Sequence, residues 1–86
     1  MPEISRFLGI VVAMFYREHA PPHFYARYRD QEIRVNIQTG DVMTGQFPSR
    51  ARRLVLEWLE LHREELMQDW RLARERKPLN PIEPLE

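Results

Sequence analysis

Two adjacent prolines, Pro21 and Pro22, limit the fold more than any other feature of this sequence. Each proline fixes its φ angle at about −65° and lacks a backbone N–H donor, so no helix or central strand can run through the pair. Pro22 also restricts Pro21, and Pro21 restricts Ala20, to extended conformations. We therefore expect a stiff, extended connector between two regular elements, with His19 and His23 at its ends.

The residues on both sides of this connector have the composition of β-strands. The first segment is rich in β-branched and aromatic side chains, and later ones alternate between apolar and polar side chains. Asp30-Gln31 and Thr39-Gly40 have the composition of tight turns. Short loops between consecutive strands indicate an antiparallel meander. The strands are expected at residues 9–17, 23–29, 32–38 and 41–47.

The second half of the chain predicts one long helix and an extended tail. Pro48 and Ser49 are typical helix-start residues, and apolar side chains then recur at three- and four-residue spacing to about Arg76. This length leaves open a break near Leu61-His62. Residues 77–86 carry prolines at three-residue spacing, which is typical of an extended, polyproline-like arm. The stripe comprises Ala51, Val55, Trp58, Leu59, His62, Leu66, Trp70 and Ala73.

These elements predict an α+β fold, in which an antiparallel meander of three to four strands packs on one long C-terminal helix. We expect a single domain over residues 1–86, with strands in 1–47, the helix in 48–76 and an extended proline-rich C-terminal arm in 77–86. A domain of 86 residues buries a modest fraction of its surface, so a homodimer or a partner could add stability.

Composition narrows the classes of function. The chain has no cysteine, which excludes disulfides and cysteine-based zinc sites and fits a cytoplasmic protein. No signal-peptide pattern opens the sequence, and its longest apolar run is too short to span a bilayer, so we expect no membrane association. A net charge of zero argues against strong nonspecific binding of nucleic acid, although a local basic patch would still allow some.

The histidines beside the prolines are the first candidates for chemistry. Alternation places His23, Tyr25 and Arg27 on one strand face, close to His19. Histidine titrates near neutral pH and arginine can stabilise an anionic transition state, so these four residues could serve a metal-independent endoribonuclease. An ordinary solvated strand face explains the same pattern, and no carboxylate–histidine pair is evident, which weakens the enzyme hypothesis. Neither histidine lies on an apolar stripe, so we expect replacing both to leave the fold intact.

A metal site would need more ligands than these two histidines. Glu18 and His62 could complete a set, but His62 lies on the apolar stripe of the helix, where a core histidine is the simpler interpretation. We therefore assign no metal ligand and expect no cofactor.

Three arginines, Arg50, Arg52 and Arg53, lie in the first turn of the predicted helix. Cations at this end oppose the helix dipole, and together with free backbone N–H groups they could bind a phosphate or carboxylate. They are therefore candidate anion- or nucleic-acid-binding residues. The alternative is that Arg53 pairs with Glu57 one turn later and that the others are solvated.

Several motifs together resemble the bacterial domain-of-unknown-function family 4160 over nearly the whole chain. They are Ile4-Ser5-Arg6-Phe7 with Gly9-Ile10-Val11, His19-Ala20-Pro21-Pro22-His23-Phe24, Thr39-Gly40-Asp41, Glu57-Trp58, His62-Arg63-Glu64-Glu65-Leu66 and Ile82-Glu83-Pro84-Leu85. Members are small bacterial proteins that are often encoded beside another small protein, which is similar to toxin–antitoxin pairs and implies a protein partner. Members often carry a third histidine where this chain has Tyr25, so a three-histidine metal site is incomplete here.

The leading hypothesis is therefore a binding component of a two-gene, toxin–antitoxin-like module with a partner encoded by the neighbouring gene. The alternatives are a metal-independent endoribonuclease and a metal-binding protein.

Overall fold

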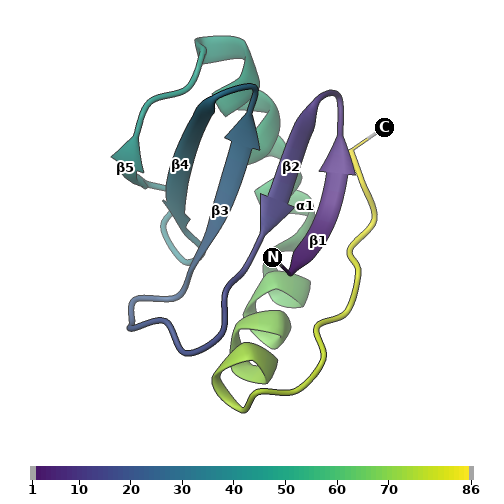
Figure 1. Cartoon of the computed structure of the whole chain (residues 1–86). Coiled ribbons are helices and arrows are strands. Elements are labelled where there is room, and N and C mark those ends of the chain that lie inside the picture. Colours follow the sequence, from purple (N-terminus) through teal and green to yellow (C-terminus); the bar gives the residue numbers. More distant parts are fainter. Residues whose placement is uncertain (1, 86) are drawn as a thin grey trace.

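The computed structural model describes residues 2–85, in which a five-stranded antiparallel sheet packs on one long helix. The strands lie in the sheet in chain order, and Figure 1 shows the helix behind them and the C-terminal tail beside β1. The predicted α+β class is confirmed, although the meander has five strands instead of three to four. The elements are β1 (Glu3–Phe7), β2 (Ile10–Ala13), β3 (His23–Tyr28), β4 (Gln31–Asn36), β5 (Val42–Gly45) and α1 (Ser49–Arg74).

The first strand, β1, was not expected from the sequence. Leu8 and Gly9 form a tight turn with φ angles of 51° and 82°, which folds β1 back onto β2. Alternation along β1 is broken, because Ile4 and Ser5 are both buried and the pairing shifts register there. This irregularity removes the period-two pattern that would have marked the strand.

The strand expected over residues 9–17 ends four residues early, at Ala13. Residues 14–22 form a loop, here called the proline loop, and Arg17 within it has a φ angle of 63°. Met14 is nevertheless fully buried, and Phe15 packs edge-on against Tyr25 with ring centroids 4.8 Å apart. The apolar residues after Ala13 therefore belong to a loop that packs on the domain. Periodicity alone does not distinguish a short apolar segment in such a loop from one in a strand.

The hairpin between β3 and β4 turns at Arg29-Asp30, one residue before the predicted position. Arg29 has a φ angle of 57°, and Tyr28 pairs directly with Gln31. This two-residue turn places Tyr25 opposite Arg34 across the two strands. The register of this hairpin brings an arginine to the candidate site described below.

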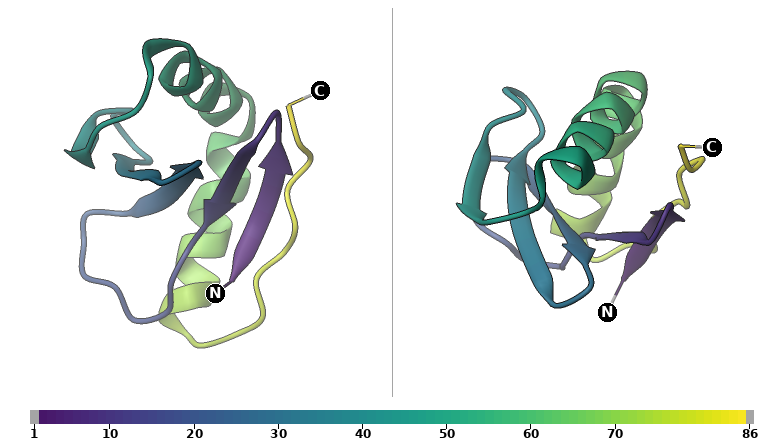
Figure 2. Two further views of the ribbon diagram at one scale, coloured as in Figure 1. Left: turned by 45° about the horizontal axis from the view of Figure 1, so that its top comes forward. Right: turned by 90° about the horizontal axis from the view of Figure 1, so that it is seen from above.

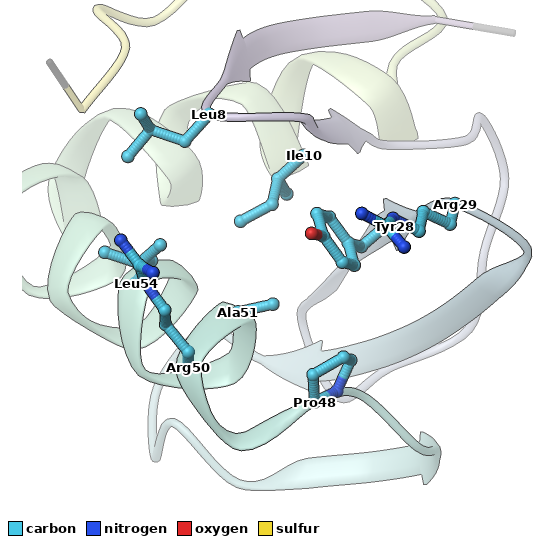
Figure 3. A pocket seen from close by; sticks show the side chains of 8 residues that line it. All are labelled: Leu8, Ile10, Tyr28, Arg29, Pro48, Arg50, Ala51 and Leu54. Carbon is cyan, nitrogen blue, oxygen red and sulfur yellow. The ribbon is translucent and has the colours of Figure 1, made fainter.

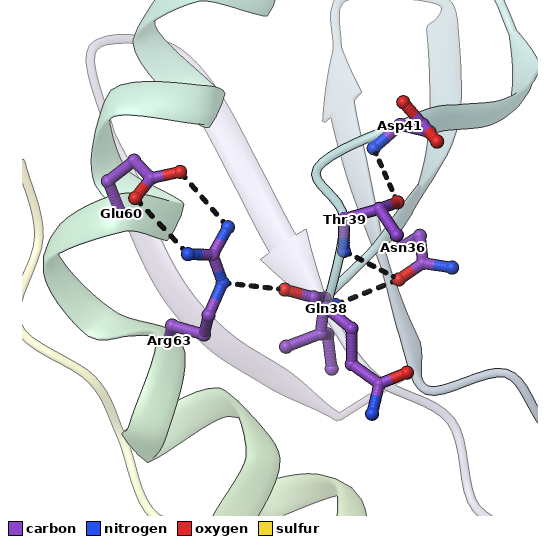
Figure 4. A network of polar contacts seen from close by, with 7 residues as sticks. Asn36, Gln38, Thr39, Asp41, Glu60 and Arg63 are labelled. Carbon is purple, nitrogen blue, oxygen red and sulfur yellow. Dashed lines mark hydrogen bonds and ion pairs between the residues drawn. The ribbon is translucent and has the colours of Figure 1, made fainter.

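The connection between β4 and β5 is fixed by its own side chains and by the helix (Figure 4). The Asn36 side-chain oxygen accepts hydrogen bonds from the backbone N–H groups of Gln38 and Thr39, at 2.8 and 3.0 Å. Arg63 of α1 donates from Nε to the Ile37 carbonyl at 2.9 Å, while Glu60 accepts two hydrogen bonds from the same guanidinium group. The turn is thus joined to the middle of the helix.

The apolar face of α1 packs on the sheet around Trp58, which is fully buried. Its ring lies 5.5 Å from Phe7 and 5.8 Å from Phe24, centroid to centroid. Helical geometry breaks at His62, with φ −127° and ψ 25°, and Figure 2 shows the two halves of α1 running in different directions. The helix ends at Arg74, two residues before the predicted Arg76.

The remaining buried side chains of this face follow the predicted stripe. They are Ala51, Val55, Leu59, Leu66, Trp70 and Ala73. No helix within residues 2–85 is long and apolar enough to cross a membrane.

The tail after α1 is extended, as predicted, and docks on the domain. The backbone N–H of Ile82 donates to the Ile4 carbonyl at 2.8 Å, and the Ile82 side chain is buried. Trp58 donates from Nε1 to the Glu83 carbonyl at 2.9 Å. Leu79 and Leu85 pack against the same core. The tail therefore covers the outer edge of β1, which would otherwise be open to pairing with another chain.

One buried carboxyl group also holds the tail. Asp69 is 1% exposed, and its Oδ1 accepts a hydrogen bond from the Asn80 backbone N–H at 2.9 Å, whereas Oδ2 has no partner among the described residues. Burial raises the pKa of Asp69 above its usual value of 3.8, and the hydrogen bond from Asn80 opposes this shift only in part. Compared with the unfolded chain, the folded protein therefore shifts Asp69 towards its protonated form.

This shift predicts a defined pH dependence of stability. Above pH 3.8, the folded state holds the Asp69 proton more tightly than the unfolded state, so the free energy of unfolding falls as the pH rises towards the raised folded pKa. The variant Asp69→Asn has no proton to lose at this position, so its free energy of unfolding should not fall in this way. Its stability relative to the wild type should therefore increase as the pH rises from 3.8 towards the folded pKa of Asp69. Urea denaturation of both proteins at several pH values measures the difference. A constant difference across the series would contradict the prediction.

Candidate functional site

The proline loop returns the chain to the sheet at His23, the first residue of β3. The Ala20–Pro21 peptide bond is cis, and the Pro21 carbonyl faces the ring of His23. Because Glu18 and Pro21 both contact His23, the loop turns back onto the first residue of β3, which differs from the extended connector expected from the sequence.

His23 is buried, with 3% of its surface exposed. Its Nδ1 lies 2.7 Å from the Pro21 carbonyl oxygen, and its Nε2 lies 3.1 Å from Glu18 Oε1. On another side, the ring packs against Trp70 of α1, with centroids 5.2 Å apart. The burial of His23 therefore removes the basis for expecting that both histidines can be replaced with the fold intact, because a histidine can be buried by a neighbouring helix without lying on an apolar stripe.

Glu18 connects the loop to two residues of β3. Besides its contact with His23, Glu18 Oε1 accepts a hydrogen bond from the Tyr25 hydroxyl at 2.8 Å. This hydrogen bond is the main cause that lowers the pKa of Glu18, with His23 and the charge of Arg34 adding to it against the effect of burial. Burial, followed by the nearby Glu18 carboxylate, raises the pKa of Tyr25. Glu18 is therefore held as a carboxylate and Tyr25 as a neutral donor.

Arg34 completes the group from the neighbouring strand β4. Its guanidinium carbon lies 5.3 Å from the centre of the Tyr25 ring, a cation–π arrangement. Its Nε is buried and makes no hydrogen bond within residues 2–85. Glu18, His23, Tyr25 and Arg34 are called the histidine cluster below.

The chemistry open to the histidine cluster follows from its hydrogen bonds. A carbonyl oxygen and a carboxylate oxygen can only accept, and both ring nitrogens of His23 face such acceptors within the protein. Neither nitrogen is therefore free to contact a substrate. The cluster is arranged to fix the proline loop on the sheet.

The structure brings together only part of the predicted catalytic set of His19, His23, Tyr25 and Arg27. His23 and Tyr25 meet at Glu18, but His19 is exposed in the proline loop. Arg27 is also exposed, and its guanidinium group lies 4.0 Å from Glu32, not in the cluster. The carboxylate–histidine pair that the sequence did not reveal is formed by Glu18 and His23.

The two residues missed by sequence reasoning carried different signals. Glu18 had been considered only as a metal ligand, and nothing local indicates that the loop folds back far enough for it to reach β3. Arg34 follows only from the correct hairpin register, in which it is the cross-strand neighbour of Tyr25. Within residues 2–85, no three histidine, aspartate or glutamate side chains come together in a way that could hold a metal ion.

The three arginines at the start of α1 are all exposed. Arg50 borders a pocket at the opposite end of the sheet from the proline loop, whereas Arg52 and Arg53 do not line it. No acidic residue lies in the first turn of the helix, and no side chain caps it. The expected grouping of the three as one anion site remains a prediction.

Fold and site together define a small α+β domain in which a helix and a proline-stiffened loop are fixed on a five-stranded meander. The chain belongs to the family described as domain of unknown function DUF4160, whose model matches residues 9–71. That match spans the proline loop and the histidine cluster, while β1 and the docked tail lie outside it. No curated protein and no solved structure matches the sequence significantly.

The burial of His23 predicts different effects for the two histidines. His23→Gln should lower the free energy of unfolding by about 1–3 kcal/mol, because it removes a buried ring and leaves polar partners unsatisfied. His19→Gln, at an exposed position, should change it by less than about 0.5 kcal/mol. Urea denaturation followed by tryptophan fluorescence compares the two variants. If His23→Gln changed the free energy of unfolding as little as His19→Gln, the structural role of His23 would be contradicted.

Proposed function

We propose that this protein is a binding component of a two-gene, toxin–antitoxin-like module in the bacterial cytoplasm, and that its partner is the product of a neighbouring gene. The observation that carries the proposal is the anchoring of the proline loop by the buried contacts of His23 with Glu18 and Pro21. A loop that is already fixed loses little conformational freedom when a partner binds. The gene arrangement implied by the family resemblance supports the same conclusion.

The side chains that the proline loop exposes suit a protein interface. Tyr16 is 40% exposed, and Arg17 and His19 are exposed beside it. Tyrosine and arginine are enriched among the residues that contribute most to binding between proteins. The histidine cluster therefore serves recognition indirectly, since it holds these three side chains in place.

Co-expression tests this proposal directly. The tagged protein and the product of the neighbouring small gene should purify together, and the double variant Tyr16→Ala/His19→Ala should lose the partner. The matched control Thr44→Ala/Gln46→Ala, at exposed positions in and just after β5, should retain it. Light scattering of the same sample determines whether the chain is present as a homodimer. Partner retention in the loop variant would place the interface elsewhere, and failure of the wild type to bind the partner would reject the proposal.

A metal-independent endoribonuclease is the second candidate, because the contact between Glu18 and His23 supplies a carboxylate–histidine pair. In this hypothesis His19, the exposed histidine of the predicted set, exchanges the proton, and the contact between Glu18 and His23 fixes the loop that carries His19.

Incubation with single-stranded RNA in the presence of a chelator tests this second candidate. Cleavage should persist with the chelator and should fall by about 10²–10⁴-fold in the His19→Gln variant, which retains the fold. No cleavage by the wild type, or full activity in His19→Gln, would reject the enzyme hypothesis.

A further inference from the structure

A pocket lies at the end of the sheet opposite the proline loop, where three separate segments meet (Figure 3). The turn after β1 contributes Leu8, the end of β3 and its turn contribute Tyr28 and Arg29, and the start of α1 contributes Arg50 and neighbouring residues. Its volume is about 510 Å³, within the range of pockets that bind small molecules. None of its lining residues belongs to the histidine cluster.

The lining is largely apolar. Ile10 and Ala51 are buried at its base, Leu54 is half-buried, and Leu8 is 55% exposed at the rim. Figure 3 shows these side chains and the Tyr28 ring around one common space. Such a surface favours an apolar group, whose transfer from water is the main source of binding free energy.

The charged side chains that line this pocket are both positive. Its lining contains Arg29 and Arg50 and no acidic residue. The guanidinium carbon of Arg29 lies 5.3 Å from the centre of the Tyr28 ring, and no ion pair joins either arginine to another residue within 2–85. By contrast, Arg6 and Arg63 on other surfaces are paired with glutamates.

The backbone adds to this positive potential. The first N–H groups of α1 have no acceptor within the helix, and no side chain caps them. The positive end of the helix dipole therefore lies beside Arg50 and faces no acidic residue of the first turn.

We propose that this pocket binds an organic carboxylate with an apolar body. The apolar body occupies the space between Leu8, Ile10 and Leu54, and the carboxylate accepts hydrogen bonds from Arg29 or from Arg50, which lie on opposite sides of the pocket (Figure 3). Arginine forms paired hydrogen bonds with carboxylates, which gives the site both charge and geometric selectivity. This ligand site is separate from the partner surface on the proline loop, and it does not depend on the function proposed for that loop.

The apolar lining distinguishes this ligand from a nucleic acid. A phosphate backbone would be held by exposed cations regardless of the pocket, and Arg52 and Arg53 would then contribute as much as Arg50. A carboxylate in the pocket depends only on the arginines that line it. The two cases therefore predict different effects for substitutions within one turn of the same helix.

Titration of the ¹⁵N-labelled protein, monitored by NMR, tests the proposal with two matched pairs of probes. The first pair is 4-phenylbutyrate and 4-phenylbutyramide. The second is acetylated triglycyl-leucine with a free or an amidated C-terminus. Comparing the two pairs shows whether the carboxylate comes from a free organic acid or from the end of a peptide. At least one acid should shift the amide signals of Leu8, Arg29 and Ala51 and should bind about tenfold more tightly than its amide.

Variants then assign the effect to this pocket. Arg29→Gln/Arg50→Gln should reduce acid binding to the level of the amide, whereas the matched control Arg52→Gln/Arg53→Gln should not change it. Leu8→Asn should weaken both members of a pair, and asparagine tolerates the positive φ angle of 51° at this position. Amide spectra of the free variants verify that each one is folded.

Three outcomes would overturn the proposal. One is that neither acid shifts these signals, and another is that acid and amide bind equally well. The third is that Arg52→Gln/Arg53→Gln weakens binding as much as the pocket variant, which would indicate diffuse attraction of anions.

Discussion

The structure depends above all on the burial of Trp58 at the middle of its single helix. The indole ring packs between Phe7 of β1 and Phe24 of β3, so it joins the two halves of the sheet to α1. Its N–H group is a donor that must be paired when it is removed from water. The Glu83 carbonyl of the tail supplies that acceptor, and Ile82 then completes the outer edge of β1. One side chain thus links sheet, helix and tail.

The two halves of α1, on either side of His62, have different roles. Helical geometry breaks at His62, which lets the halves follow different parts of the curved sheet (Figure 2). The first half brings Arg50 to the pocket, and the second half brings Trp70 against His23. The proposed recognition loop and the proposed ligand pocket therefore lie at opposite ends of the sheet and share no side chains.

The candidate site could be predicted only where it follows from strand alternation. Alternation placed His23 and Tyr25 on one face, and both meet Glu18 in the structure. Alternation also placed Arg27 on this face, and the cation was therefore assigned to Arg27. The turn expected at Asp30-Gln31 would have paired Tyr25 with Asn36. The turn one residue earlier pairs Tyr25 with Arg34 instead. A one-residue change in the turn shifts cross-strand pairing by two residues, and no local pattern distinguished the two turns.

The sequence by itself determined the α+β class, the alternation of β3 and β4, the apolar stripe of α1 and the extended course of the tail. Each of these depends on side-chain spacing along a single segment, which selects the secondary structure and the face that it buries. Tertiary structure alone decided that residues 3–7 pair with β2, that the tail docks beside them, and that Glu18 folds back to a buried His23. These features depend on which distant segments come into contact. Spacing within one segment carries no information about its partner, because the same apolar face can be buried by a strand, a helix or a loop.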